Sequence, residues 1–82
     1  SASVIHDSGA LADAAATALT IAGPNDWHRI ARNMGVKYVM LVDDNGSIYV
    51  NPAMLDRINF ESDEQFEIIV SKPLITKDKS GV

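Results

Sequence analysis

Two oxygen-bearing side chains, Asp13 and Thr17, lie four residues apart in an otherwise apolar segment, LADAAATAL. On a helix, residues at i and i+4 place their Cβ atoms about 5 to 6 Å apart, so a carboxylate and a hydroxyl can converge on one hard cation. Magnesium accepts both oxygen types, and waters and substrate phosphates usually complete its shell. Asp13 and Thr17 are therefore candidate ligands for half of a magnesium site. The alternative is that they only form, with Thr20, the solvent-exposed face of an amphipathic helix.

Other polar groups have weaker signals. His6 and His28 do not have the spacing of zinc ligands, and we expect both to be structural or solvent-exposed. The run 43–46, Asp-Asp-Asn-Gly, begins like a calcium loop but lacks the alternating ligands and the closing glutamate, so it predicts a turn. Trp27 is predicted to be a core anchor. No Ser/His/Asp arrangement or glycine-rich phosphate loop is present, so no catalytic residue is assigned.

Composition limits the possible classes of protein. The chain has 82 residues, 46% of them hydrophobic and 22% charged, which predicts one globular domain with a thin core. A net charge of -4 argues against non-specific nucleic-acid binding, which needs a basic surface. There is no cysteine, and no apolar run approaches the roughly 20 residues of a membrane span.

Two helices are predicted to position the polar pair. The first covers about Ala10 to Ala22 and follows a capping residue, Asp7 or Ser8, while Gly23-Pro24 ends it. The second follows Pro24 and ends at Gly35. At 100° per residue, the polar residues of the first helix lie opposite an apolar face of unusually small side chains: Leu11, Ala14, Ala15, Ala18, Leu19 and Ala22.

Strand patterns occupy the remainder of the chain. They fall at 2–5, 37–42, 47–50 and 66–71, with a type I′ hairpin turn predicted at Asn45-Gly46. Residues 54–60 fit a helical turn or an irregular strand, and 61–64 predict an acidic loop. We therefore expect an α+β fold, with two helices packed on a small, largely antiparallel sheet. Residues 1–72 form this unit, and 73–82 are expected to be a flexible tail.

The letters around Asp13 and Thr17 resemble the C-terminal part of the FAD:protein FMN transferase family, the ApbE-like flavin transferases. The resemblance begins at Ser3 and extends to about Pro52. Its most specific part is the family pattern A-D-A-x-A/S-T-A-L-x-x-x-G-P, which is matched by Ala12, Asp13, Ala14, Ala16, Thr17, Ala18, Leu19, Gly23 and Pro24. Two positions depart from the family, because Ala15 stands where Leu is usual and Thr20 where a large apolar residue is usual.

The resemblance implies a Mg²⁺-dependent transferase that moves FMN from FAD to a threonine of an acceptor flavoprotein and releases AMP. The family's metal-binding Asp and Thr match Asp13 and Thr17. The family's flavin-binding segments and remaining metal contacts would lie upstream, so the chain is expected to be a C-terminal fragment that is inactive alone. The resemblance also implies a bacterial periplasmic protein or an inner-membrane lipoprotein that faces the periplasm. The alternative is a non-catalytic α+β interaction or dimerisation module.

Overall fold

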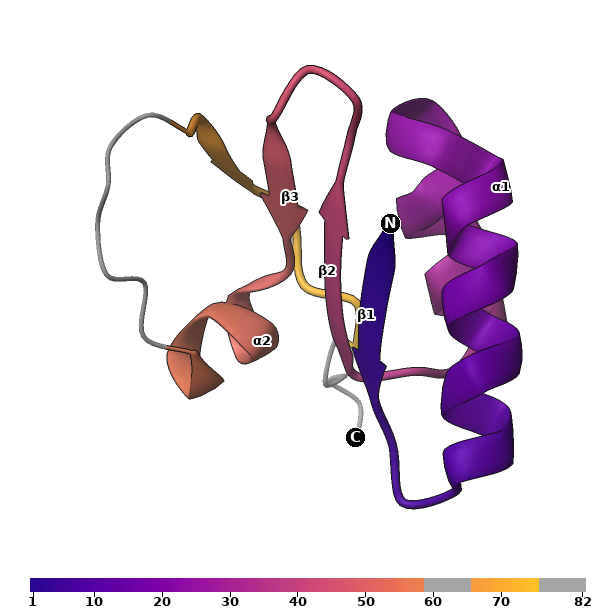
Figure 1. The fold of residues 1–82 in the computed structure, drawn as a ribbon. Coiled ribbons are helices and arrows are strands. Elements are labelled where there is room, and N and C mark those ends of the chain that lie inside the picture. The colour runs from indigo at the N-terminus through magenta and orange to yellow at the C-terminus, as the bar shows by residue number, and fades with distance from the viewer. Residues whose placement is uncertain (59–65, 76–82) are drawn as a thin grey trace.

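A computed structural model describes residues 1–58 and 66–75 of the chain. The elements follow in the order β1 (Ala2–Ile5), α1 (Gly9–Met34), β2 (Tyr38–Val42), β3 (Ile48–Val50), α2 (Pro52–Arg57) and β4 (Ile68–Val70). Figure 1 shows a single sheet with α1 on one side and α2 on the other. The predicted α+β class is therefore confirmed. No helix in the described part of the chain is long and apolar enough to cross a membrane.

The sheet has the strand order β1-β2-β3-β4 and mixed pairing. β1 pairs antiparallel with β2, and β2 pairs antiparallel with β3. β4 pairs parallel with β3, with Tyr49 opposite Ile69. The sheet is thus largely antiparallel, as predicted. The parallel pair needs a crossover between β3 and β4, and α2 lies within that connection.

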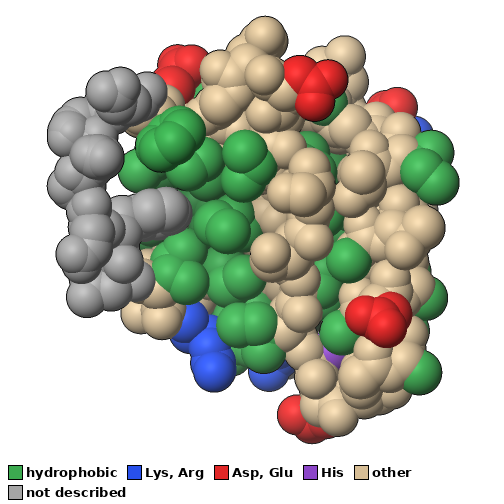
Figure 2. Space-filling model, viewed as in Figure 1, with side chains coloured by type: hydrophobic (Ala, Val, Ile, Leu, Met, Phe, Trp, Pro, Cys, Tyr) green, Lys and Arg blue, Asp and Glu red, His purple; other side chains and the backbone are tan. Residues whose placement is uncertain are grey.

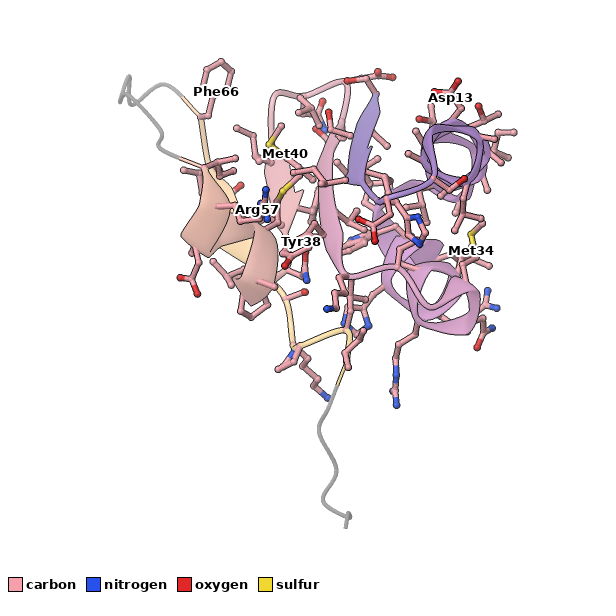
Figure 3. The ribbon with its side chains drawn as sticks, turned by 90° about the horizontal axis from the view of Figure 1, so that it is seen from below. Asp13, Met34, Tyr38, Met40, Arg57 and Phe66 are labelled. Carbon is pink, nitrogen blue, oxygen red and sulfur yellow. The ribbon has the colours of Figure 1, made fainter. Side chains whose placement is uncertain are left out.

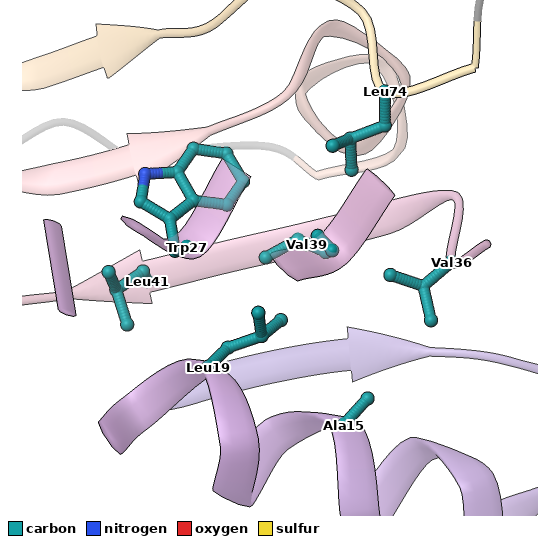
Figure 4. Close-up of a cluster of buried hydrophobic side chains, with 8 residues drawn as sticks. Ala15, Leu19, Trp27, Val36, Val39, Leu41 and Leu74 are labelled. Atoms are coloured by element: carbon teal, nitrogen blue, oxygen red, sulfur yellow. The ribbon is translucent and has the colours of Figure 1, made fainter. Parts of the chain in front are cut away.

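Both halves of α1 pack on one face of the sheet and form the main core (Figures 1 and 4). Side chains alternate between the two faces of a strand, so every second residue of β2 points toward α1. The core combines small residues of α1 with larger ones from the sheet, and its members are Ala15, Leu19, Trp27, Ala31, Val36, Val39, Leu41 and Leu74.

The other face of the sheet, which we call the second face, is only partly covered by α2. Ile48 and Val50 are buried there together with Met54 of α2. Val50 lies opposite Met40 in the β2–β3 register and opposite Val70 in the β3–β4 register, so these residues share a face. Ile68 and Val70 of β4 are 42% and 47% exposed. Figure 2 shows the resulting continuous apolar surface.

The helix boundaries agree with the prediction. Gly23, with φ 77° and ψ −175°, interrupts α1 just before Pro24, so the long helix consists of the two predicted segments. Ser8 is the N-terminal cap, and Gly35 ends the second segment in the left-handed conformation. Residues 52–57 are helical, which resolves the choice left open for this region over the part of it that the structure describes.

The predicted type I′ turn at Asn45-Gly46 is wrong. The turn hydrogen bond runs from the Gly46 amide to the Asp43 carbonyl, and the Asp43 amide donates to the Ser47 carbonyl. The central residues are therefore Asp44 and Asn45, and Gly46 follows them with φ 89°. This is the pattern of a three-residue hairpin loop with a glycine bulge. The Asp43 side chain stabilises this loop, because its carboxylate accepts hydrogen bonds from the amides of Asn45 and Ser47 at 2.9 and 3.0 Å.

Two predicted segments fall largely outside the described residues. The acidic loop at 61–64 lies outside them, as do residues 76–82 of the predicted tail. Within the described part of that tail, Leu74 is 4% exposed and belongs to the main core. Packing therefore continues two residues beyond the predicted boundary at residue 72.

Candidate metal half-site

The N-terminus of α1 fixes the register of the candidate ligands. The Ser8 hydroxyl accepts a hydrogen bond from the Leu11 amide at 3.1 Å, and the Ser8 carbonyl accepts one from the Ala12 amide at 3.0 Å. The Ser8 amide in turn donates to Nδ1 of His6 at 2.9 Å. A serine cap satisfies amides that the first helical turn leaves free. Asp13 consequently lies in the second turn at a defined angle around the helix.

Asp13 and Thr17 lie on the same exposed side of α1. Figure 3 shows Asp13 pointing outward from α1, clear of the sheet. The Thr17 hydroxyl donates a hydrogen bond to the Asp13 carbonyl at 3.1 Å. A hydroxyl that donates its proton backward along the helix keeps its oxygen lone pairs available on the outer side. Thr20 makes the same bond to the Ala16 carbonyl at 2.8 Å, one turn further along.

This donor set fits Mg²⁺ as part of a site. Both side chains offer oxygen, which is the ligand atom of this ion, and both are exposed to solvent. Two ligands leave room for waters and phosphate oxygens. In the part of the chain that the structure describes, no group of three or more His, Cys, Asp or Glu side chains gathers to hold a metal. A metal site at Asp13 and Thr17 would therefore need further ligands from outside the described part of the chain, such as waters, phosphate oxygens or other polypeptide.

The opposite side of the helix is held close to the sheet by small residues. Ala15 and Leu19 are fully buried. Ala14 is exposed, so its predicted place on the apolar face is wrong. Ala15 takes the position where the resembling family usually has Leu, and its single methyl group lets the helix backbone approach β1 and β2. Figure 4 shows Ala15 and Leu19 directed toward these strands. This close contact fixes the position of the helix backbone that carries Asp13 and Thr17.

The second segment of α1 contributes to the packing. Trp27 is buried, which confirms it as a core anchor, and its ring meets the His28 ring edge-on with centroids 5.4 Å apart. His28 Nε2 lies 2.9 Å from the Lys72 carbonyl, which links α1 to the segment after β4. His28 is thus structural, as expected. His6 is exposed, and its Nδ1 accepts the hydrogen bond from the amide of the capping residue Ser8.

A pocket that the sequence patterns did not indicate lies at the end of β1. Its volume is about 360 Å³. We call it the basic pocket because Lys37 and Arg57 line it, together with Ile5, His6, Asp7, Gly35 and Tyr38. Its residues come from three segments that are far apart in sequence. The sequence shows that Lys37 and Arg57 are charged but not that they lie close together, because no periodic pattern links the end of a strand to the last turn of α2.

Comparison with known proteins gives one informative match. A protein named FAD:protein FMN transferase, from Rhodobacter capsulatus, is 55% identical to this chain over 58 residues. The match covers 71% of this chain and 11% of that protein. No protein-family model matches the chain. No solved structure matches it either.

The match supports the resemblance that the residues around Asp13 and Thr17 indicated. At 55% identity over 58 residues, the similarity extends well beyond the nine matched positions of the motif. The chain spans only 11% of the length of the relative. The activity of the whole relative is therefore a matter for proposal.

Proposed function

We propose that this chain is the C-terminal part of a Mg²⁺-dependent FAD:protein FMN transferase, to which it contributes Asp13 and Thr17 as two metal ligands. One observation carries the proposal. The two oxygen donors are exposed together on one side of α1, in a chain that is 55% identical over 58 residues to a protein of that name. The Thr17 hydroxyl is oriented by its hydrogen bond to the Asp13 backbone carbonyl.

The proposed reaction moves FMN from FAD to a threonine of an acceptor flavoprotein. The threonine hydroxyl oxygen forms a phosphoester bond to the FMN phosphorus, the phosphoanhydride bond to the AMP phosphate breaks, and AMP leaves. The hydroxyl proton passes to a general base. When bound, Mg²⁺ would neutralise charge on the diphosphate. The role of this chain is to hold the Asp13 carboxylate and the Thr17 hydroxyl at a fixed spacing toward the ion.

The remainder of the site would come from upstream polypeptide. The second face of the sheet supports this arrangement, because it exposes apolar side chains of β4 that further polypeptide would cover. On this proposal the isolated chain is inactive. The location proposed for the protein is the bacterial periplasm, or the inner membrane as a lipoprotein that faces the periplasm, on the basis of family resemblance alone.

The test uses a flavin transferase that contains this chain and measures Mg²⁺-dependent transfer of FMN to a threonine-containing acceptor. Asp13→Asn and Thr17→Val are each expected to reduce the rate on the order of 100-fold, as the loss of one transition-state stabilising group does elsewhere. A second readout is the affinity for Mn²⁺ as a substitute ion, measured by paramagnetic relaxation of water, which should weaken in both variants.

Thr20→Val is the matched control. Thr20 also carries an exposed hydroxyl that bonds to a helix carbonyl, yet it lies seven residues from Asp13, about two helical turns away. Transfer by this variant should stay within about twofold of the unmodified enzyme. Full activity in Asp13→Asn and Thr17→Val would overturn the ligand assignment and favour the non-catalytic interaction module.

A further inference from the structure

We propose that the basic pocket binds a phosphate group, free or carried by a small organic phosphate, at a place separate from Asp13 and Thr17. The pocket combines two cationic side chains, Lys37 and Arg57, with the imidazole of His6. This site does not depend on a metal ion or on the transferase reaction.

Arg57 is oriented by contact with a neighbouring ring. Its guanidinium carbon lies 4.8 Å from the centroid of the Tyr38 ring, within the range of a cation–π contact. Figure 3 shows the two side chains beside each other at the junction of α2 and β2. Stacking over the ring leaves the edge of the guanidinium, with its N–H donors, free for an anion. A planar group of fixed orientation loses little rotamer freedom when it binds a phosphate oxygen.

His6 supplies a defined donor. Its Nδ1 accepts a hydrogen bond from the Ser8 amide at 2.9 Å, so in the neutral ring the proton is carried by Nε2. The β1–α1 connection thus presents an N–H donor and not a second acceptor to the pocket. Lys37 adds an exposed ammonium group at the start of β2.

The cations of the pocket form no ion pair with another described residue. Within residues 1–58 and 66–75, the only ion pair is between Arg29 and Asp26, at 3.3 Å. The Asp7 carboxylate also lines the pocket and opposes an anion there. Two of the five Lys and Arg residues in the described ranges thus line one pocket of a protein whose net charge is -4. Figure 2 shows Lys and Arg atoms gathered at the lower border of the apolar surface.

The pocket volume and its walls set the size of the ligand. About 360 Å³ is within the range of small-molecule sites, and it exceeds what one inorganic phosphate needs. Ile5 and Tyr38 provide apolar surface next to the cations. In a small organic phosphate, the phosphate would therefore contact the cationic side chains and the organic group would contact the apolar surface.

The experiment is an amide chemical-shift titration of the ¹⁵N-labelled 82-residue chain with inorganic phosphate, at constant ionic strength and with EDTA present. The amides of Gly35, Lys37 and Tyr38 should shift and saturate, while those of Asp13 and Thr17 should not move. Lys37→Gln and Arg57→Gln should each weaken binding about tenfold or more, because hydrogen bonds to charged groups contribute about 1.5 to 3 kcal/mol. Asp7→Asn should tighten it.

Arg32→Gln is the control, since Arg32 is an exposed arginine of α1 that does not line the pocket. Its phosphate affinity should equal that of the unmodified chain, and the spectra verify that each variant is folded. Repeating the titration with AMP separates the sources. Tighter binding of AMP identifies an organic phosphate, and equal binding identifies the free anion. Shifts that do not saturate, or equal weakening by Arg32→Gln, would overturn the proposal. Because EDTA removes divalent ions, failure here is distinct from failure of the metal half-site.

Discussion

Asn51 is the residue whose polar group is best enclosed by the fold. It is 1% exposed, and its side chain bridges two backbone groups of the β2 region. Its Oδ1 accepts from the Val39 amide at 2.9 Å, and its Nδ2 donates to the Lys37 carbonyl at 2.7 Å. The amide therefore replaces ladder hydrogen bonds at the point where β3 ends and α2 begins. A buried amide group with both partners satisfied specifies this junction more sharply than an apolar side chain would.

Replacing Asn51 should test that role directly. Asn51→Ala removes both hydrogen bonds and leaves an amide and a carbonyl without partners, so the free energy of unfolding should fall by about 2 to 4 kcal/mol. Urea unfolding followed by circular dichroism measures the change. Asn33→Ala, at an exposed position of α1, is the control and should change it by less than about 0.5 kcal/mol. Similar values for the two variants would contradict the structural role of Asn51.

Tyr49 couples stability to alkaline pH. Desolvation raises the pKa of its hydroxyl above the ordinary value of 10.0, and the negative charges of Asp43 and Glu67 raise it further. The folded protein therefore keeps this proton at a pH where the unfolded chain has lost it. The stabilisation is complete below pH 10 and is lost as pH rises through the folded-state pKa.

The free energy of unfolding should consequently decline more steeply above pH 10 in the unmodified chain than in Tyr49→Phe. Urea unfolding at a series of alkaline pH values gives the two slopes. Asp43→Asn should also reduce the slope, because it removes one of the charges that raise the pKa. Parallel slopes in all three proteins would show that Tyr49 does not carry the effect.

At the scale of elements, α1 depends on one residue for its change of direction. Gly23 has φ 77° and ψ −175°, a region of backbone space that is open almost only to glycine. The break lets the two segments of α1 lie side by side on one face of the sheet, with Leu19 and Trp27 in the same core.

Gly23→Ala should therefore lower the free energy of unfolding by about 1 to 3 kcal/mol through backbone strain alone. No atom lies within 4 Å of the added methyl group, so a steric clash does not contribute. Gly9→Ala also meets no atom and has an ordinary helical position, which makes it the control. Its stability should be unchanged or slightly higher. Thermal unfolding of both variants distinguishes strain from a general effect of losing a glycine.

Local signals predicted the elements well because they act within a few residues. A capping serine, the Gly23-Pro24 pair and Gly35 specify the ends of the helical segments by chemistry that neighbouring letters reveal. The turn at 43–46 was misassigned because the Asp43 side chain, and not the Asn-Gly pair, decides its geometry. The parallel pairing of β4 with β3 depends on the path of the crossover, which periodicity does not contain.

At the scale of the whole molecule, the two candidate sites differ in how visible they are in the sequence. Asp13 and Thr17 are one helical turn apart, so their spacing alone brings them together. The basic pocket joins the end of β1, the start of β2 and the end of α2, and only the assembled sheet brings these together. The placement of α2 on the second face was equally invisible, because a six-residue helix carries too short a pattern to show which surface it covers.

The exposed apolar side chains of the second face should bind an apolar dye. Ile68 and Val70 are neighbours on the same face of β4 and are both partly exposed, so an apolar dye such as ANS should bind there. The double substitution Ile68→Thr with Val70→Thr should reduce dye fluorescence by about half or more, because threonine keeps the branched shape that strands favour while adding a hydroxyl. Ile21→Thr, at an isoleucine that is 80% exposed on α1, should reduce it less. Equal reductions would mean that the exposure of single side chains, and not the shared sheet face, governs dye binding. That result would contradict the proposal that further polypeptide covers the second face.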